Sequence, residues 1–271
     1  MTKIGILAGG GKLPISIGES LLHSNYDVIF FCIKNFCNPK LYKDYVFENI
    51  SINSFSKILQ NLKNHKVEKI VMAGHITRPS IKDIDFDLNV LKIIKNFALD
   101  SKGDDRLLST ISIFFENNGF PILDWKKECK DLFINEQYLT SKKPSEIAKS
   151  NIKKGLLTFE IIGRADLSQS MIIQNNIILG IEAAEGTDEL IKRCYTYKKK
   201  GDKGILLKLS KYNQDTNLDI PVIGLETVKN LSEYDYDGVF LERDKCIIID
   251  REEVIKFCNL NHIFIATVDK N

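Results

Sequence analysis

The order of apolar and polar segments in the first half of the chain predicts alternating strands and helices. Apolar runs at 4–8, 27–32 and 69–73 have the length of buried strands. Between and after these runs, apolar residues recur at the spacing of one helix face. The predicted helices run from Pro14 through Leu22 and over 54–62, 87–99 and 105–117, and Ser54 is the expected cap of the second. Such alternation predicts a parallel sheet covered by helices on both faces.

The second half has a different pattern. Apolar runs at 167–173 and 177–181 flank Gln174-Asn175-Asn176, which predicts a β-hairpin. Further strands are predicted at 204–209, 222–224, 238–241, 246–249 and 263–268, and helices at 186–197 and 250–260, whereas a strand predicted at 120–123 belongs to the first half. The expected fold class is α/β, with an N-terminal Rossmann-like parallel-sheet domain and a C-terminal mixed α/β domain. We place the first domain at 1–130, a linker containing Pro144 at 131–150, and the second domain at 151–271.

Composition narrows the class of protein. The chain has 271 residues, of which 44% are hydrophobic and 27% charged, as in ordinary globular proteins. Its net charge of +2, with dispersed basic residues, argues against nucleic acid as the main partner. No apolar run is long enough to span a bilayer, so we expect a soluble, cytoplasmic protein. The six cysteines form no CxxC pair and are expected to be buried free thiols.

Two acidic clusters carry candidate chemistry. Glu182, Glu185 and Asp188 recur every three residues directly after an apolar run. Such carboxylates repel one another unless a cation or hydrogen-bond donors lie among them. A second cluster, Asp215 and Asp219, follows Lys208, and acids beside a base suit hard-cation and phosphate chemistry. The alternatives are an acidic first turn of a helix for the first cluster and a solvated polar loop for the second.

A glycine loop is the candidate anion site of the first half. Gly9, Gly10 and Gly11 follow a predicted strand and precede a helix, so backbone donors can approach a phosphate. The loop lacks the GxGxxG and Walker A patterns, which disfavours nicotinamide binding. A tight strand–helix turn is the alternative. Arg78, after the third strand, is a further candidate phosphate ligand, and Asp104 is either a ligand contact or a helix cap. The four histidines lack zinc-site spacing.

Five motifs follow one another in order along the chain. They are AGGGxLP at 8–14, AGxxxRP at 73–79, KGDDxLL at 102–108, EGTD at 185–188 with Arg193, and a QD-to-DIPxxG segment at 214–224. Together they resemble the LpxI-type UDP-2,3-diacylglucosamine diphosphatases. Two positions depart from the family's pattern: Asn217 stands where Arg is usual, and Ser168 stands where its DxGQ motif has Gly.

The resemblance implies Mg²⁺-dependent hydrolysis of UDP-2,3-diacylglucosamine to UMP and 2,3-diacylglucosamine 1-phosphate, a step of lipid A synthesis. The implied catalytic residues are Asp219, Asp188, Glu185 and Lys208; the implied Mg²⁺ ligands are Asp219, Asp188 and Asp215; the implied substrate-binding residues are Gly9, Gly10, Gly11, Arg78, Asp104, Thr187 and Gln214. We expect the active site between the two domains, with a hinge at Lys142–Pro144.

Other interpretations stay open. The leading alternative is a nucleotide- or phospholipid-binding sensor without chemistry, and a sugar-nucleotide oxidoreductase is a third. The acyl chains of the implied substrate need an apolar groove and favour contact with the inner-membrane surface. Assembly as a homodimer is also open.

Overall fold

The computed structural model describes residues 1–76, 104–162, 168–210 and 220–270. The chain divides into two compact units, Met1–Lys130 and Asp131–Asn271. The first contains a parallel sheet of four strands, and the second contains a mixed sheet of five. Helices pack on both sheets, so the predicted α/β fold class is confirmed.

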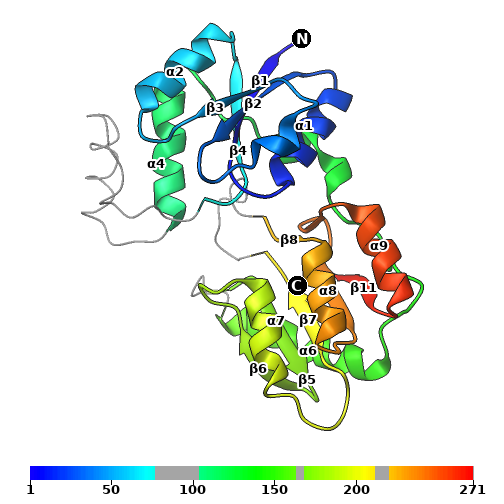
Figure 1. Ribbon diagram of the computed structural model, residues 1–271. Helices are drawn as coiled ribbons and strands as arrows, with labels where there is room; N and C mark the ends of the chain where they lie inside the picture. The colour runs from blue at the N-terminus through cyan, green and yellow to red at the C-terminus, as the bar shows by residue number, and fades with distance from the viewer. Residues whose placement is uncertain (77–103, 163–167, 211–219, 271) are drawn as a thin grey trace. The chain divides into compact units, whose positions relative to one another are not determined.

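The first unit is a parallel sheet in the order β3-β2-β1-β4. Its strands are β1 (Lys3–Ala8), β2 (Asp27–Ile33), β3 (Phe47–Ile50) and β4 (Lys69–Ala73). Its helices are α1 (Leu13–His23), η1 (Pro39–Tyr42), α2 (Phe55–Asn64), α4 (Asp104–Asn117) and α5 (Trp125–Glu128), and η3 (Lys130–Leu132) lies at the boundary of the units. Figure 1 shows α1 on one side of this sheet and α2 and α4 on the other. The helix predicted over 87–99 lies outside the described residues.

Both faces of this sheet are packed. Phe55 and Leu62 of α2 and Phe115 of α4 are buried against strand residues such as Phe31. On the other face, a Cβ at Gly18 of α1 would lie 2.2 Å from the Phe30 ring, so glycine lets α1 lie close to β2. The predicted cap of α2 is confirmed, because Ser54 Oγ accepts a hydrogen bond from Lys57 N at 3.4 Å.

The second unit is a five-stranded sheet in the order β11-β9-β7-β5-β6. Its strands are β5 (Ser170–Gln174), β6 (Ile177–Ile181), β7 (Ile205–Lys208), β9 (Gly238–Glu242) and β11 (Phe264–Val268); β8 (Val222–Ile223) and β10 (Ile247–Ile248) form a separate pair. Strand β5 runs antiparallel to both of its neighbours. The helices are α6 (Glu146–Ile162), α7 (Thr187–Tyr195), α8 (Leu225–Glu233) and α9 (Arg251–Leu260).

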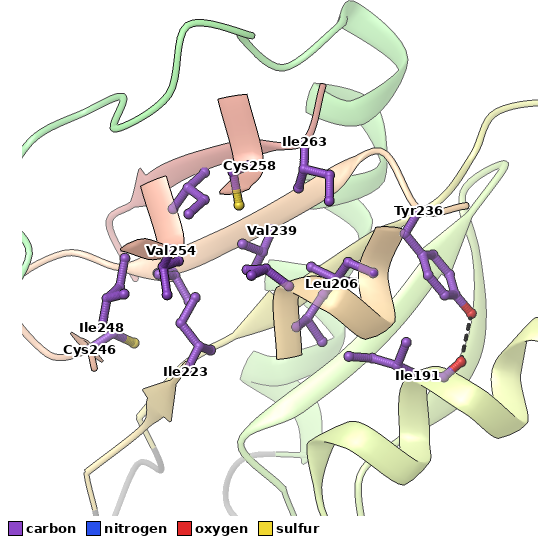
Figure 2. Packing of buried hydrophobic residues seen from close by; sticks show 14 of the residues in the cluster. Ile191, Leu206, Ile223, Tyr236, Val239, Cys246, Ile248, Val254, Cys258 and Ile263 are labelled. Carbon is purple, nitrogen blue, oxygen red and sulfur yellow. Dashed lines mark hydrogen bonds between the residues drawn. The ribbon is translucent and has the colours of Figure 1, made fainter. Parts of the chain in front are cut away.

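Helices cover both faces of the second sheet. Ile152 and Phe159 of α6 pack on one face, and α7, α8 and α9 pack on the other. Figure 2 shows the buried residues on the face covered by α7, α8 and α9, where the Tyr236 hydroxyl donates to Ile191 O at 3.1 Å. That bond satisfies a polar group which would otherwise be buried without a partner.

The predicted hairpin is confirmed. Strands β5 and β6 pair antiparallel across Asn175 and Asn176, whose φ angles are 51° and 58°. Two consecutive left-handed residues are the geometry of a tight two-residue hairpin turn, and asparagine tolerates it better than most residues do.

Several elements were absent from the sequence-based prediction, among them strand β3, helix α8 and the short helices η1, α5 and η3. Strand β3 has a polar centre, Glu48-Asn49, and α8 follows Gly224, which supplies no side-chain cap, so neither has a strong local signal. The strand predicted over 120–123 is only one parallel bridge, Ile122 to Ile70, with Leu123 N donating to Ile70 O. One bridge extends the sheet edge without forming a strand.

Residues 133–142 belong to the second unit and bond to its other elements. Leu139 N donates to Ile265 O at 3.0 Å, and Thr140 Oγ1 accepts from Ile265 N at 2.9 Å. Lys142 Nζ lies 2.5 Å from Asp237 Oδ1 and 2.8 Å from His262 O. Part of the predicted linker, 131–150, is therefore bound to the folded second unit. Among the described residues, no helix is long and apolar enough to cross a bilayer.

All six cysteines are free thiols. Five are buried, as the sequence predicted, whereas Cys37 is partly exposed and departs from that prediction.

Candidate functional site

Several candidate residues of the second unit meet at one edge of its sheet. Lys208 is the last residue of β7, and Ser170 is the first residue of β5. Because β5 and β7 are antiparallel, Ser170 pairs directly with Lys208. Glu182 follows β6, and its backbone N donates to Ser170 O at 2.9 Å. Thr187 opens α7 beside them.

Lys208 is a buried cation at this edge. Its side chain is only 5% exposed. Lys208 Nζ donates to Ser170 Oγ at 3.0 Å and to Thr187 Oγ1 at 2.5 Å. The two hydroxyl oxygens lie 3.1 Å apart. We call Lys208, Ser170, Thr187 and Glu182 the lysine cluster.

Glu182 supplies the negative charge of the lysine cluster. Thr187 Oγ1 donates to Glu182 Oε1 at 3.1 Å. Glu182 Oε2 lies 3.9 Å from Lys208 Nζ, and this buried oxygen has no hydrogen-bond partner among the residues that the structure describes. The carboxylate is thus anchored through one oxygen and leaves the other as an open acceptor.

The first turn of α7 adds backbone donors. Gly186 precedes it with φ 83°, a conformation that favours glycine, and no side chain caps the helix. N–H groups at a helix start favour a bound anion. Asp188 and Glu189 also lie in this turn, in agreement with the acidic-helix-start alternative. Asp188 Oδ1 is buried and finds no partner within the described part of the chain.

Glu185 has a cationic partner of its own. Its Oε1 accepts hydrogen bonds from Arg193 Nε at 2.9 Å and Nη2 at 2.7 Å, and Nη2 also donates to Ile181 O. A hydrogen bond from its own backbone N–H, and then those from Arg193, hold the pKa of Glu185 below its usual value. The carboxylates of Glu182, Glu185 and Asp188, which the sequence groups together, therefore have separate surroundings.

A second polar group lies at the end of β9. The buried Glu242 Oε2 accepts hydrogen bonds from Ser210 N and Ser210 Oγ, both at 2.7 Å. Lys270 Nζ donates to Ser210 O at 2.7 Å, and burial lowers the pKa of Lys270. The backbone just after Lys208 is therefore fixed.

Sequence reasoning did not select Ser170, Ser210 or Glu242. Their one local signal is a polar residue at the end of an apolar strand. Ser168, a departure from the family's pattern, has a clear function here: Ser168 Oγ donates to Ser170 O at 2.8 Å and accepts from Ser170 N at 3.1 Å. The replacement thus supports the first strand residue of the lysine cluster.

Four candidates lie outside the described residues: Arg78, Gln214, Asp215 and Asp219. Asp104 is the first residue of α4. Of the implied Mg²⁺ ligands, the structure describes Asp188. Within the described ranges, no three His, Cys, Asp or Glu residues form a group that could hold a metal ion. The buried, unpartnered Oδ1 of Asp188 nevertheless fits a hard cation as its partner.

The glycine loop of the first unit has a packing reason for its composition. Gly9 N donates to Ala73 O, and Gly10 N donates to His75 O. A Cβ at Gly9 would lie 2.7 Å from His75 O, and one at Gly10 would lie 2.5 Å from the His75 ring. Anion binding here would therefore rest on Gly11 and the first turn of α1.

Comparison with known proteins covers both units. The LpxI N-terminal domain matches residues 3–132, and the LpxI C-terminal domain matches residues 135–266. The chain is also similar to the UDP-2,3-diacylglucosamine pyrophosphatase LpxI of Caulobacter vibrioides. The two are 27% identical over 276 residues, which cover 99% of this chain and 98% of the relative. Because the two domains match in order along nearly the whole chain, this protein belongs to the LpxI family.

Proposed function

We propose that this protein hydrolyses the diphosphate of UDP-2,3-diacylglucosamine. Water adds across the P–O–P linkage, and the products are UMP and 2,3-diacylglucosamine 1-phosphate. The observation that carries the proposal is the full-length match to a relative named for this activity. The lysine cluster supports it, because a diphosphate needs fixed positive charge where negative charge develops in the transition state.

Lys208 and the start of α7 are the proposed phosphate contacts of the second unit. Two N–H groups of Lys208 donate to Ser170 and Thr187. A lysine ammonium has three donors, so one remains for a phosphate oxygen. The N–H groups of the first turn of α7 attract the same anion. Burial strengthens both interactions, because water screens them less.

We propose Mg²⁺ as the cofactor, held by Asp188, Asp215 and Asp219. When bound, Mg²⁺ offsets charge on the diphosphate. In this proposal Asp219 also accepts the proton of the attacking water, and Gln214 and Arg78 bind phosphate oxygens. Glu185, paired with Arg193, fixes the loop that leads into α7.

Release of UMP tests the activity directly. Purified protein with diacylated substrate and Mg²⁺ should release UMP, and EDTA should stop the release. Asp219→Ala should lose most turnover while its circular dichroism stays unchanged. Asp235→Asn is the matched control, because the Asp235 carboxylate forms an exposed ion pair with Lys203 and lies in no proposed site. Absence of UMP from the native protein would reject the proposed function.

The acyl chains supply a second test. Burial of a methylene is worth about 0.8 kcal/mol, so two long chains favour an apolar groove or contact with the membrane surface. We expect a deacylated substrate to have a lower kcat/KM. Equal kcat/KM for the two substrates would remove the need for an apolar groove.

A further inference from the structure

We infer that Glu182 is a positioning residue, which holds the Lys208 ammonium in the orientation in which it meets the diphosphate. The inference rests on the proposed function and adds a residue to it. Glu182 acts through two contacts: its charge faces Lys208, and its Oε1 fixes the Thr187 hydroxyl that accepts from Lys208.

Burial of Lys208 is the first reason. An ammonium that is removed from water is strongly destabilised unless an opposite charge lies close by. Within the described part of the chain, Glu182 is the carboxylate found within 4.0 Å of Lys208 Nζ, at 3.9 Å. Its side chain is itself only 16% exposed, so water screens the attraction weakly.

The assignment of hydrogen-bond donors and acceptors in the lysine cluster is the second reason. Lysine only donates, so both hydroxyl oxygens accept from Lys208 Nζ. The Thr187 proton is then directed to Glu182 Oε1, and the Ser170 proton can donate to Thr187 Oγ1. This order of donors fixes two N–H directions of Lys208, and therefore the third. Without the Glu182 acceptor, the Thr187 hydroxyl could rotate and the ammonium would lose its fixed direction.

The position of Glu182 in the chain is the third reason. Its backbone N–H is bound to Ser170 O directly after β6, so the Glu182 Cα is fixed to the same edge of the sheet as Lys208. Glu185 and Asp188 follow in the loop and in α7 and make none of these contacts. The geometry therefore separates Glu182 from the other two carboxylates.

A double-mutant cycle tests the inference. Glu182→Gln, Lys208→Met and the double variant are compared with the native chain in UMP release with Mg²⁺. Glu182→Gln keeps an acceptor oxygen but removes the charge that faces Lys208, so the ammonium should shift and kcat should fall by about 10²-fold, since small misplacements of catalytic groups have effects of this size. KM should change by less than about threefold. In the Lys208→Met background, Glu182→Gln should change kcat by no more than about twofold.

One control variant and two contrary outcomes complete this test. Glu160→Gln removes an exposed carboxylate from α6, which lies in no proposed site, and should leave kcat unchanged. Multiplicative losses in the double variant would overturn the inference, since Glu182 would then act independently of Lys208. A raised Mg²⁺ requirement in Glu182→Gln with unchanged kcat at saturating Mg²⁺ would also overturn it, in favour of a metal ligand.

A readout without turnover separates this inference from the proposed function. If the native protein releases no UMP, the proposed function fails, but the same cycle can be measured on the urea midpoint of unfolding. Effects of the two substitutions that depend on each other would support the pairing of Glu182 with Lys208. Strictly additive effects would overturn it.

Discussion

At the scale of single residues, the Thr187 hydroxyl joins the opposite charges of the lysine cluster. It accepts from Lys208 and donates to Glu182. Valine has the shape of threonine without the hydroxyl, so Thr187→Val should break both bonds with little change in volume. We predict a loss of about 10²-fold in kcat for UMP release. Thr187→Ser keeps the hydroxyl and should retain most activity; equal loss in both variants would contradict the bridging role.

Gly9 and Gly10 both pack closely against the chain near His75, but the atoms that a Cβ would meet differ between the two positions. At Gly9 the obstacle to a Cβ is backbone, His75 O at 2.7 Å, whereas at Gly10 it is the ring of an exposed histidine. Gly9→Ala should lower the free energy of unfolding by about 1–3 kcal/mol, because backbone must shift. Gly10→Ala should cost less than about 1 kcal/mol, because the imidazole can turn away. Urea unfolding measures both, and a more severe effect at Gly10 would refute this explanation.

The sequence predicted only some residues of the lysine cluster, and there is a physical reason why the others were missed. Lys208, Thr187 and Glu182 could be selected as chemically suitable residues near strand ends. Their mutual contacts depend on the antiparallel direction of β5, which brings Ser170 beside Lys208. A single polar residue ahead of an apolar run gives no sign of such a neighbour, so Ser170 was missed.

At the scale of elements, the Glu185–Arg193 pair links the loop after β6 to the last turn of α7. The folded pKa of Glu185 is lowered, so its contribution to stability is present above its unfolded pKa, about 4.3. It is lost as the pH falls through the lower, folded value. Glu185→Gln should therefore be less stable than native protein at pH 7, by at most about 1 kcal/mol for an exposed pair.

The measurement is the unfolding midpoint of native protein and Glu185→Gln across the pH range. The two curves should converge once the pH falls below the folded pKa of Glu185, where both side chains are neutral. Glu160→Gln, an exposed change on α6, is the control and should show no such convergence. A difference that stays constant down to that pH would exclude the ion pair as its cause.

Elements with a strong period were predictable, and those stabilised mainly by neighbours were not. The buried run of β1 and the Asn-Asn turn of the β5–β6 hairpin each carry a local signal. Strand β3 does not: Glu48 and Asn49 interrupt its apolar pattern, and its place is fixed by pairing with β2. Helix α8 likewise depends on burial of Val228 and Leu231 in the core of the second unit.

At the scale of the whole molecule, the two units have separate cores. A fragment of residues 131–271 keeps the contacts of Leu139, Thr140 and Lys142 and should fold with cooperative thermal unfolding. A fragment of residues 151–271 loses them, together with the first turn of α6, and should unfold at a lower temperature. Circular dichroism and amide NMR dispersion provide the comparison, and equal melting temperatures would show that the segment before 151 is dispensable.

The reactivity of the buried thiols can measure local opening of the folded chain. Burial raises the pKa of Cys194 to about 11 and of Cys246 and Cys258 to about 12, and it also raises the pKa of Cys32. Maleimide reacts with thiolates, so these groups should be silent in the folded state at neutral pH. With the partly exposed Cys37 replaced by serine, labelling at Cys32 would time the opening of the first unit, and labelling at Cys194, Cys246 and Cys258 would time that of the second. Mass spectrometry of the labelled thiols would then give two opening rates from one sample.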